Sequence, residues 1–280
     1  MDTVTSADGT RIAYSRTGDG PALLLVHGTG VDRRVWDDVT AALGESFTVF
    51  AVDRRGRGDS GDLRQTSSTE PTRTEGSGDA DAYAIEREFD DLAALASSVD
   101  GPVNLLGHSY GGICAIGAAP RLSNLRRLIL YEPPLWRGDG PSTPSPSPEQ
   151  RRMAELADRG EHEAVLETYW ADMRGQPDRL ERLRSRPDYD RRVDAAHTLP
   201  REMQGRREYR PTPETYPDVD VPTLLLNGSE THDGLKRAAA VTEDLFPNTT
   251  SVEFEGHGHA AMNTAPDRFV SEVVSFLTDG

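Results

Sequence analysis

The sequence predicts an α/β fold in which a doubly wound, mainly parallel sheet carries helices on both faces. Short apolar runs typical of strands alternate with longer runs typical of helices, and this alternation is the pattern of a parallel sheet with crossover helices. The chain has 280 residues, which is enough for one large core with an insertion. We therefore expect one α/β core rather than several small domains.

The expected elements follow one another in a regular order. A hairpin at residues 4–14 turns around Asp8-Gly9 and supplies the first two strands. The later strands are expected at 23–26, 48–52, 103–106, 128–131, 223–227 and 251–254. The helices between them are expected at 35–43, 85–98, 110–119, 235–245 and 267–277. Together these runs predict an eight-stranded sheet.

The motif Gly107-His108-Ser109-Tyr110-Gly111 stands between an expected strand and an expected helix. It reads G-x-S-x-G, and the strand–turn–helix context is the one that a nucleophile elbow requires. A serine on so tight a turn has a strained backbone, and glycine on both sides removes side chains that would collide. The sequence therefore predicts that Ser109 is an exposed nucleophile.

A serine hydroxyl needs a base before it can attack a carbonyl carbon. The base is expected in the loop after the last strand, where His257 and His259 compete. We favour His259, because Gly258 precedes it and small residues follow it, which suits a side chain that reaches over the serine.

The turn His27-Gly28-Thr29-Gly30 follows an apolar strand and presents backbone N–H groups. We assign the N–H groups of Thr29 and Tyr110 as the donors of an oxyanion hole. His27 itself is expected to be a buried structural residue that hydrogen-bonds the loop.

These motifs, taken together, resemble the α/β-hydrolase fold over nearly the whole chain. The turn Asp53-Arg54-Arg55-Gly56-Arg57-Gly58-Asp59-Ser60 is similar to the family's D-x-R-G-x-G-x-S turn and stands in the family's order with the other motifs. The resemblance implies a lid inserted after the sixth strand. Residues 135–217 fit this position, since charged helical patterns replace the alternation there. We expect a core of residues 1–134 and 218–280, and a lid whose Trp136, Tyr169 and Trp170 are candidate substrate contacts.

The third member of the triad departs from the family's pattern. The usual acid follows the penultimate strand as G-x-x-D, and here that position holds Thr231. Glu230 and Asp233 are near it. Glu132 is our first choice, because haloalkane dehalogenases resemble this chain in carrying an acid at that strand end. Pro133 is expected to hold Glu132 in an extended conformation that aims its carboxylate into the site.

Composition sets further expectations. The chain has a single cysteine, no apolar run near the ~20 residues that span a bilayer and no N-terminal signal pattern. Metal-ligand spacing and a dinucleotide-binding loop are also absent from the sequence. We therefore expect a cytoplasmic enzyme without cofactor or metal that binds neither nucleic acid nor membranes. The net charge of −16 and the single lysine, Lys236, resemble proteins of salt-accumulating halophiles.

These features predict a cofactor-free serine hydrolase that cleaves a small to medium carboxylic ester through an acyl-enzyme on Ser109. The same triad supports perhydrolysis of the haloperoxidase type, C–C bond hydrolysis or a lyase reaction, because the fold does not fix the chemistry. A ligand-binding receptor is the alternative outside enzymes, since the displaced acid leaves room for a weakened catalyst.

Overall fold

The computed structural model describes residues 1–62, 83–136, 144–172, 178–217 and 219–278. An eight-stranded sheet runs through its centre in the order β1-β2-β4-β3-β5-β6-β7-β8. The strands are β1 (Asp2–Thr5), β2 (Arg11–Thr17), β3 (Ala22–Val26), β4 (Thr48–Val52), β5 (Val103–His108), β6 (Leu125–Tyr131), β7 (Thr223–Gly228) and β8 (Thr249–Phe254). Strand β2 pairs antiparallel with β1 and with β4, and the remaining pairs are parallel. The predicted mainly parallel sheet of eight strands is confirmed.

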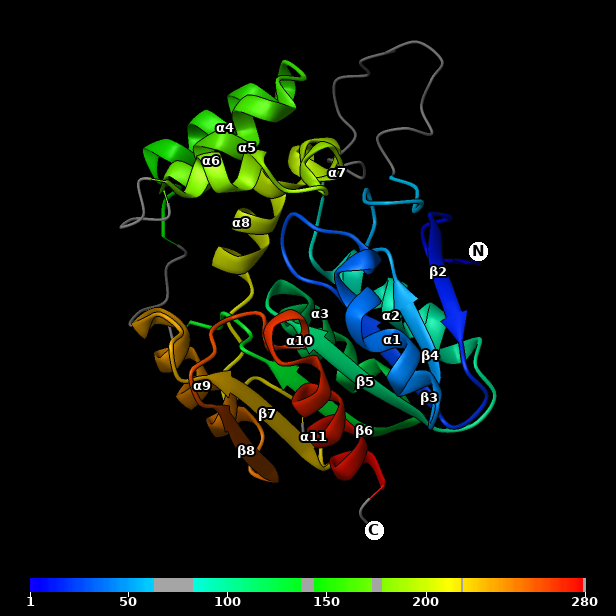
Figure 1. Ribbon diagram of the computed structural model, residues 1–280. Helices are drawn as coiled ribbons and strands as arrows, with labels where there is room; N and C mark the ends of the chain where they lie inside the picture. Colours follow the sequence, from blue (N-terminus) through cyan, green and yellow to red (C-terminus); the bar gives the residue numbers. More distant parts are fainter. Residues whose placement is uncertain (63–82, 137–143, 173–177, 218, 279–280) are drawn as a thin grey trace.

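Helices cover both faces of this sheet (Figure 1). The helices on one face are α1 (Asp37–Gly44), α10 (Ala261–Thr264) and α11 (Pro266–Thr278), and those on the other are α2 (Glu86–Ser97), α3 (Tyr110–Ala118) and α9 (Asp233–Leu245). Successive side chains of a strand point to opposite faces, so Leu24 joins one hydrophobic cluster and Leu25 the other. The two clusters hold the sheet between the helix layers.

Between β6 and β7 the described chain is helical. Its helices are α4 (Pro148–Asp158), α5 (His162–Asp172), α6 (Arg179–Arg184), α7 (Tyr189–Ala195) and α8 (Leu199–Glu208). A separate hydrophobic cluster around Met153, Val165 and Leu199 joins these helices to one another. Figure 1 shows α4–α7 as a group apart from the sheet, with α8 between that group and the core. We call α4–α8 the inserted helices.

The start of α4 has a local cause. Ser147 accepts a hydrogen bond from the backbone N–H of Gln150, whose side chain accepts one from the backbone N–H of Ser147. This reciprocal pair is a capping box, and Pro148 follows at a position where its missing N–H is no loss. Within the described ranges, no helix combines the length and the apolar character needed to cross a bilayer.

Candidate active site

The turn from β5 into α3 carries Ser109 in a strained backbone conformation, with φ 54° and ψ −124°. A Cβ atom on Gly107 would lie 2.5 Å from the carbonyl oxygen of Gly111, and one on Gly111 would collide with the carbonyl oxygen of Val26. The turn therefore requires glycine at both flanks. The N–H of Ser109 donates to the carbonyl of Tyr131 at 2.8 Å, which holds the turn against the end of β6.

Two groups far apart in the sequence meet next to this turn. The Nδ1 atom of His259 lies 2.5 Å from Oε2 of Glu132, whose side chain is fully buried, while the His259 side chain is 38% exposed. An ionised carboxylate only accepts hydrogen bonds, so Nδ1 carries the proton and donates it to this contact. In the neutral imidazole the other nitrogen, Nε2, then has a free lone pair. The pair can supply a base.

The Glu132 carboxylate is held from three sides. Its Oε1 accepts from the backbone N–H of Gly228 at 2.8 Å, and its Oε2 accepts from the Thr231 hydroxyl at 3.1 Å as well as from His259. Thr231 therefore occupies the position of the family's usual acid and donates a hydrogen bond to Glu132. Glu230 and Asp233 are exposed, and Asp233 is the first residue of α9.

The expectation that Glu132 is extended is wrong, because its φ is 44°. The N–H of Glu132 donates to the carbonyl of Leu226 at 3.1 Å while its carboxylate bonds to Gly228 and Thr231. These contacts outweigh the preference that a following proline imposes. Among the described residues other than glycine, only Ser109 and Glu132 have a positive φ. Strain of this kind gathers at functional sites.

The loop that carries His259 is held by two residues that the sequence analysis did not single out for this role. The Nε2–H of His108 donates to the carbonyl of His259 at 2.8 Å, and the two rings lie 4.6 Å apart. The Tyr131 hydroxyl donates to the carbonyl of Gly258 and accepts from the N–H of Ala261. Burial lowers the pKa of His108 well below its usual value, so its ring is a neutral donor.

His257, the competing histidine, is turned toward a different partner. Its Nδ1 lies 2.9 Å from the Thr264 hydroxyl of α10. The structure thus brings His259 to Glu132 and leaves His257 in contact with the nearby helix α10.

The His27–Gly30 loop approaches the Ser109 turn closely. A Cβ atom on Gly28 would lie 3.0 Å from Cβ of Ser109, so this loop and the serine turn are in close contact. Tyr110 is the first residue of α3, and such a residue has no acceptor for its N–H within its own helix. Both donors assigned from the sequence therefore belong to segments that meet at Ser109.

His27 is fully buried and has two backbone partners. Its Nδ1–H donates to the carbonyl of Gly28 at 2.9 Å, and its Nε2 accepts from the N–H of Arg54 at 3.1 Å. Burial lowers its pKa well below the usual value. A neutral ring with a hydrogen bond at each nitrogen holds the loop in shape, which is the structural role expected for it.

Buried ion pairs tie α8 to the core beneath this loop. Arg54 bonds to Glu88 at 2.6 Å and to Glu202 of α8 at 2.8 Å, and Arg57 also pairs with Glu202. The Arg54 guanidinium lies 4.5 Å from the centre of the Tyr110 ring. The arginines of the D-x-R-G-x-G-x-S turn thus link the serine turn to the inserted helices.

The three aromatic candidates of the insertion occupy two places. Trp136, four residues after Glu132, is 50% exposed. Tyr169 and Trp170 of α5 make an edge contact at 5.9 Å and pack against the cluster of the inserted helices. Packing within the insertion thus accounts for part of the contacts of Tyr169 and Trp170.

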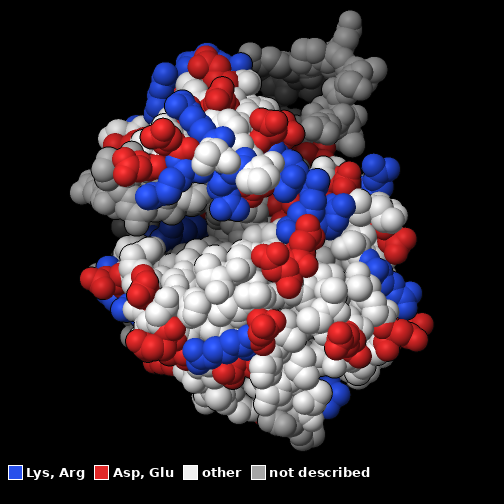
Figure 2. Space-filling view, in the orientation of Figure 1, with Lys and Arg blue, Asp and Glu red and all other residues white. Residues whose placement is uncertain are grey.

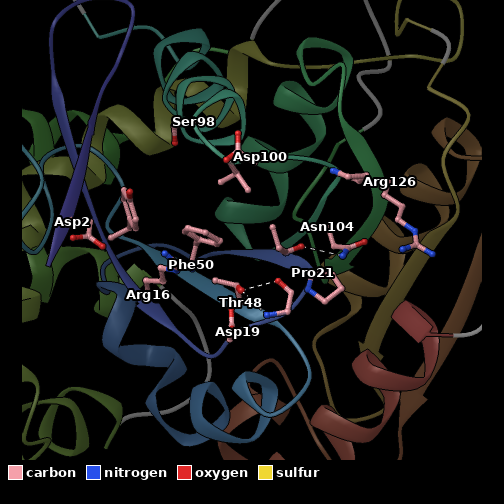
Figure 3. Close-up of a pocket in the computed structure, with 15 residues that line it drawn as sticks. Asp2, Arg16, Asp19, Pro21, Thr48, Phe50, Ser98, Asp100, Asn104 and Arg126 are labelled. Atoms are coloured by element: carbon pink, nitrogen blue, oxygen red, sulfur yellow. Dashed lines mark hydrogen bonds between the residues drawn. The ribbon is translucent and has the colours of Figure 1, made fainter.

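A cavity of about 550 Å³ lies at the other end of the sheet (Figure 3). It is formed at the amino ends of the strands, where Thr48 bonds to Gly20 and Asn104 bonds to the carbonyl of Ala22. These polar groups already tie the entry to β3 in place. Ligands of open α/β sheets bind at the carboxyl ends of the strands instead, and Ser109 lies there. Around the described residues, no group of three or more His, Cys, Asp or Glu side chains is arranged to hold a metal ion.

Comparisons with known proteins agree with the fold described above. Among solved structures, an alpha/beta hydrolase from Sphaerobacter thermophilus is 30% identical over 99% of this chain and 100% of that chain, with a TM-score of 0.80. An esterase from Rhodococcus is 25% identical over 99% of this chain and 98% of that chain, with a TM-score of 0.70. An esterase from Exiguobacterium antarcticum is 21% identical over 99% of both chains, with a TM-score of 0.75.

An uncharacterised protein of Mycobacterium tuberculosis is 36% identical over 124 residues, which are 44% of this chain and 32% of that protein. The match thus spans about a third of the length of this curated relative. A sequence profile described as the alpha/beta hydrolase family matches residues 23–272. This match includes the whole of the site described above, and the chain belongs to the alpha/beta hydrolase family.

Proposed function

We propose that this protein is a cofactor-free serine hydrolase that cleaves a small to medium carboxylic ester through an acyl-enzyme on Ser109. The observation that carries the proposal is the Glu132–His259 pair, with Nδ1 2.5 Å from Oε2, next to a serine on a strained turn. Nucleophile, base and orienting acid are the three groups that acyl transfer needs. The 25% identical esterase supports an ester as the first substrate to test.

In the proposed reaction, Nε2 of His259 accepts the proton of the Ser109 hydroxyl as Oγ attacks the ester carbon. The N–H groups of Thr29 and Tyr110 stabilise the oxyanion, and each such donor contributes about 10²- to 10³-fold to the rate. Glu132 stabilises the imidazolium, which then protonates the leaving alcohol. In the second half, His259 takes a proton from water as the water oxygen attacks the acyl carbon, and the imidazolium then returns that proton to Oγ of Ser109 as the C–O bond breaks and the acid leaves.

We also propose that residues 135–217 act as a lid over this site. Two contacts support the proposal. Glu202 of α8 pairs with Arg54 beneath the oxyanion loop, and a Cβ atom on Gly30 would lie 3.5 Å from the Leu199 side chain. A lid in this place would exclude water and select the substrate.

The test is hydrolysis of p-nitrophenyl esters of graded chain length by the wild type and by Ser109→Ala. Ser251→Ala is the matched control, because Ser251 is exposed and its hydroxyl bonds only to Glu243 among the described residues. We expect turnover that disappears in Ser109→Ala and is unchanged in Ser251→Ala. Parallel assays in multimolar KCl and in dilute buffer test the halophilic setting proposed from the net charge of −16.

Two results would contradict the proposal. One is a folded wild type that leaves every ester intact, and the other is a Ser109→Ala variant that is as active as the wild type. Tight ligand binding without turnover would then favour the receptor alternative. Peroxide-dependent halogenation in acetate would instead indicate perhydrolysis on the same triad.

A further inference from the structure

Helix α8 contacts both segments that supply the proposed oxyanion donors. The side chain of its first residue, Leu199, would lie 3.5 Å from a Cβ atom built on Gly30. A Cβ atom on Gly205 would collide with the Tyr110 hydroxyl. Gly205 therefore packs directly against the end of the Tyr110 side chain. Arg206 comes next in the helix, beside this contact with Tyr110, the residue that follows the serine.

The Arg206 guanidinium has aromatic rather than acidic surroundings. The Cζ atom of Arg206 lies 5.6 Å from the centre of the Trp136 ring. Burial lowers the pKa of Arg206, and the groups that oppose this effect are the Tyr169 and Tyr110 hydroxyls. Trp136 follows the acid strand, Tyr110 follows the serine and Tyr169 is on α5. The guanidinium thus contacts one aromatic ring and is influenced by the hydroxyls of two tyrosines.

Several other arginines of this region have carboxylate partners, and Arg207, the next residue of α8, donates instead to the Gln150 side chain and the Met203 carbonyl. The ion pairs are Arg54 with Glu88 and Glu202, Arg55 with Asp91, Arg57 with Glu202, Arg192 with Asp188, and Arg201 with Asp62. Arg206, in contrast, forms no ion pair with any residue in the described part of the chain. The chain has 47 acidic and 31 basic residues, so carboxylates are not scarce. A half-buried guanidinium without an ion-pair partner can pair with a bound anion, which would offset the cost of its partial removal from water.

We infer that Arg206 binds the carboxylate of an acidic substrate, an ester that carries a free carboxylate besides the bond to be cleaved. This inference rests on the proposed ester hydrolysis at Ser109. A guanidinium is planar and matches a carboxylate with two parallel hydrogen bonds. A guanidinium that stacks on a ring face can still donate its N–H groups to such a pair. Figure 2 shows a hollow between the inserted helices and the core, with basic side chains at its left end.

The inference changes the expected substrate in a specific way. The net charge of −16 repels an anion at long range. A local positive charge at the site would therefore have to supply the selectivity for an acidic ester. The preference should depend on Arg206 and not on arginines elsewhere on the inserted helices.

The experiment compares monoethyl succinate with ethyl 4-methylpentanoate, in which two methyl groups replace the carboxylate oxygens. Monoethyl glutarate and monoethyl adipate extend the series, so that one of the acids can match the distance to Arg206. The variants are Arg206→Gln, Arg206→Lys and the control Arg152→Gln. Arg152 is on α4, 52% exposed and 3.6 Å from Glu155, so its loss changes the net charge equally.

We expect the wild type to have a higher kcat/KM for at least one acidic ester than for the neutral one. Arg206→Gln should reduce this ratio by about 10- to 100-fold, mainly through KM, since it removes a charge-assisted hydrogen bond. Arg206→Lys should lie between, and Arg152→Gln should stay within about twofold of the wild type. A ratio that is unchanged in Arg206→Gln, or a wild type without the preference, would overturn the inference.

Calorimetric binding of the same acidic esters to Ser109→Ala, with and without Arg206→Gln, separates the two proposals. Binding that is lost with Arg206→Gln supports the inference even if no ester is cleaved. Cleavage of esters with no effect of Arg206→Gln would leave the hydrolase proposal standing and refute the role of Arg206. Absence of binding would refute the inference directly.

Discussion

Replacement of Glu132 by glutamine tests the proposed triad more sharply than any other change. The carboxylate accepts from Gly228 at 2.8 Å, from Thr231 at 3.1 Å and from His259 at 2.5 Å. Glutamine has one acceptor oxygen and one NH₂ group, which only donates. If the oxygen stays with the Gly228 N–H, the NH₂ group faces Nδ1 of His259. His259 must then accept at Nδ1 and carry its proton on Nε2, where it can no longer take a proton from Ser109.

The opposite orientation of the amide is also unfavourable. It would place the NH₂ group against the N–H of Gly228, so two donors would face each other at a fully buried position. We therefore expect Glu132→Gln to reduce kcat by about 10³- to 10⁴-fold, which corresponds to about 4–5.5 kcal/mol in the activation free energy. KM should change little, because this residue does not contact substrate in the proposed mechanism.

The assay is the initial rate of ester hydrolysis, with thermal unfolding and near-UV circular dichroism to verify that each variant folds. Glu230→Gln and Asp233→Asn are the controls, because each removes one exposed carboxylate near the same loop. Both should stay within about twofold of the wild type. A Glu132→Gln variant that keeps more than about a tenth of kcat would refute this reasoning, and so would a comparable loss in either control.

Two further predictions concern Gly28 of the oxyanion loop and the two buried histidines, His27 and His108. Gly28→Ala should lower kcat by about 10-fold or more, because its Cβ would lie 3.0 Å from Cβ of Ser109 and must displace the loop; steady-state kinetics with unchanged kcat would contradict this close approach. Below pH ~6.5 the unfolded chain protonates His27 and His108 whereas the folded chain keeps them neutral, so each should lower the free energy of unfolding by about 1.4 kcal/mol per pH unit. The free energy of unfolding, measured with urea between pH 7 and 5.5, should depend less steeply on pH in His27→Gln than in the wild type. An equal pH dependence would show that His27 does not titrate in this way.

The sequence predicted the sheet and the serine turn well because their causes are local. Gly107 and Gly111 are required by backbone atoms only a few residues away or in the adjacent strand. Apolar runs such as residues 23–26 are fully buried strands, which a short continuous apolar stretch already indicates. Such features can be read without knowledge of the tertiary contacts.

Helix α8 and Arg206 could not be read in the same way. Pro200 and Gly205 weaken the helical pattern, and the sequence analysis did not indicate a helix at residues 199–208. The glycine is explained by the Tyr110 hydroxyl and the Ile85 side chain, which together leave no room for a Cβ atom. A contact between residues 110 and 205 has no signature in either segment alone. The same holds for Tyr131 and His108 as supports of the His259 loop.

The position of the acid follows from the order of the strands. Strands β6 and β7 are parallel neighbours, with Tyr131 opposite Leu226, so their carboxyl ends meet at one edge of the sheet. A carboxylate after either strand can therefore reach the same histidine. Glu132 bonds to Gly228 and Thr231 at the end of β7, so the carboxylate stands beside the family's usual position although it enters from the other strand. The family's usual acid would accept a hydrogen bond at position 231, whereas the Thr231 hydroxyl donates one to Glu132.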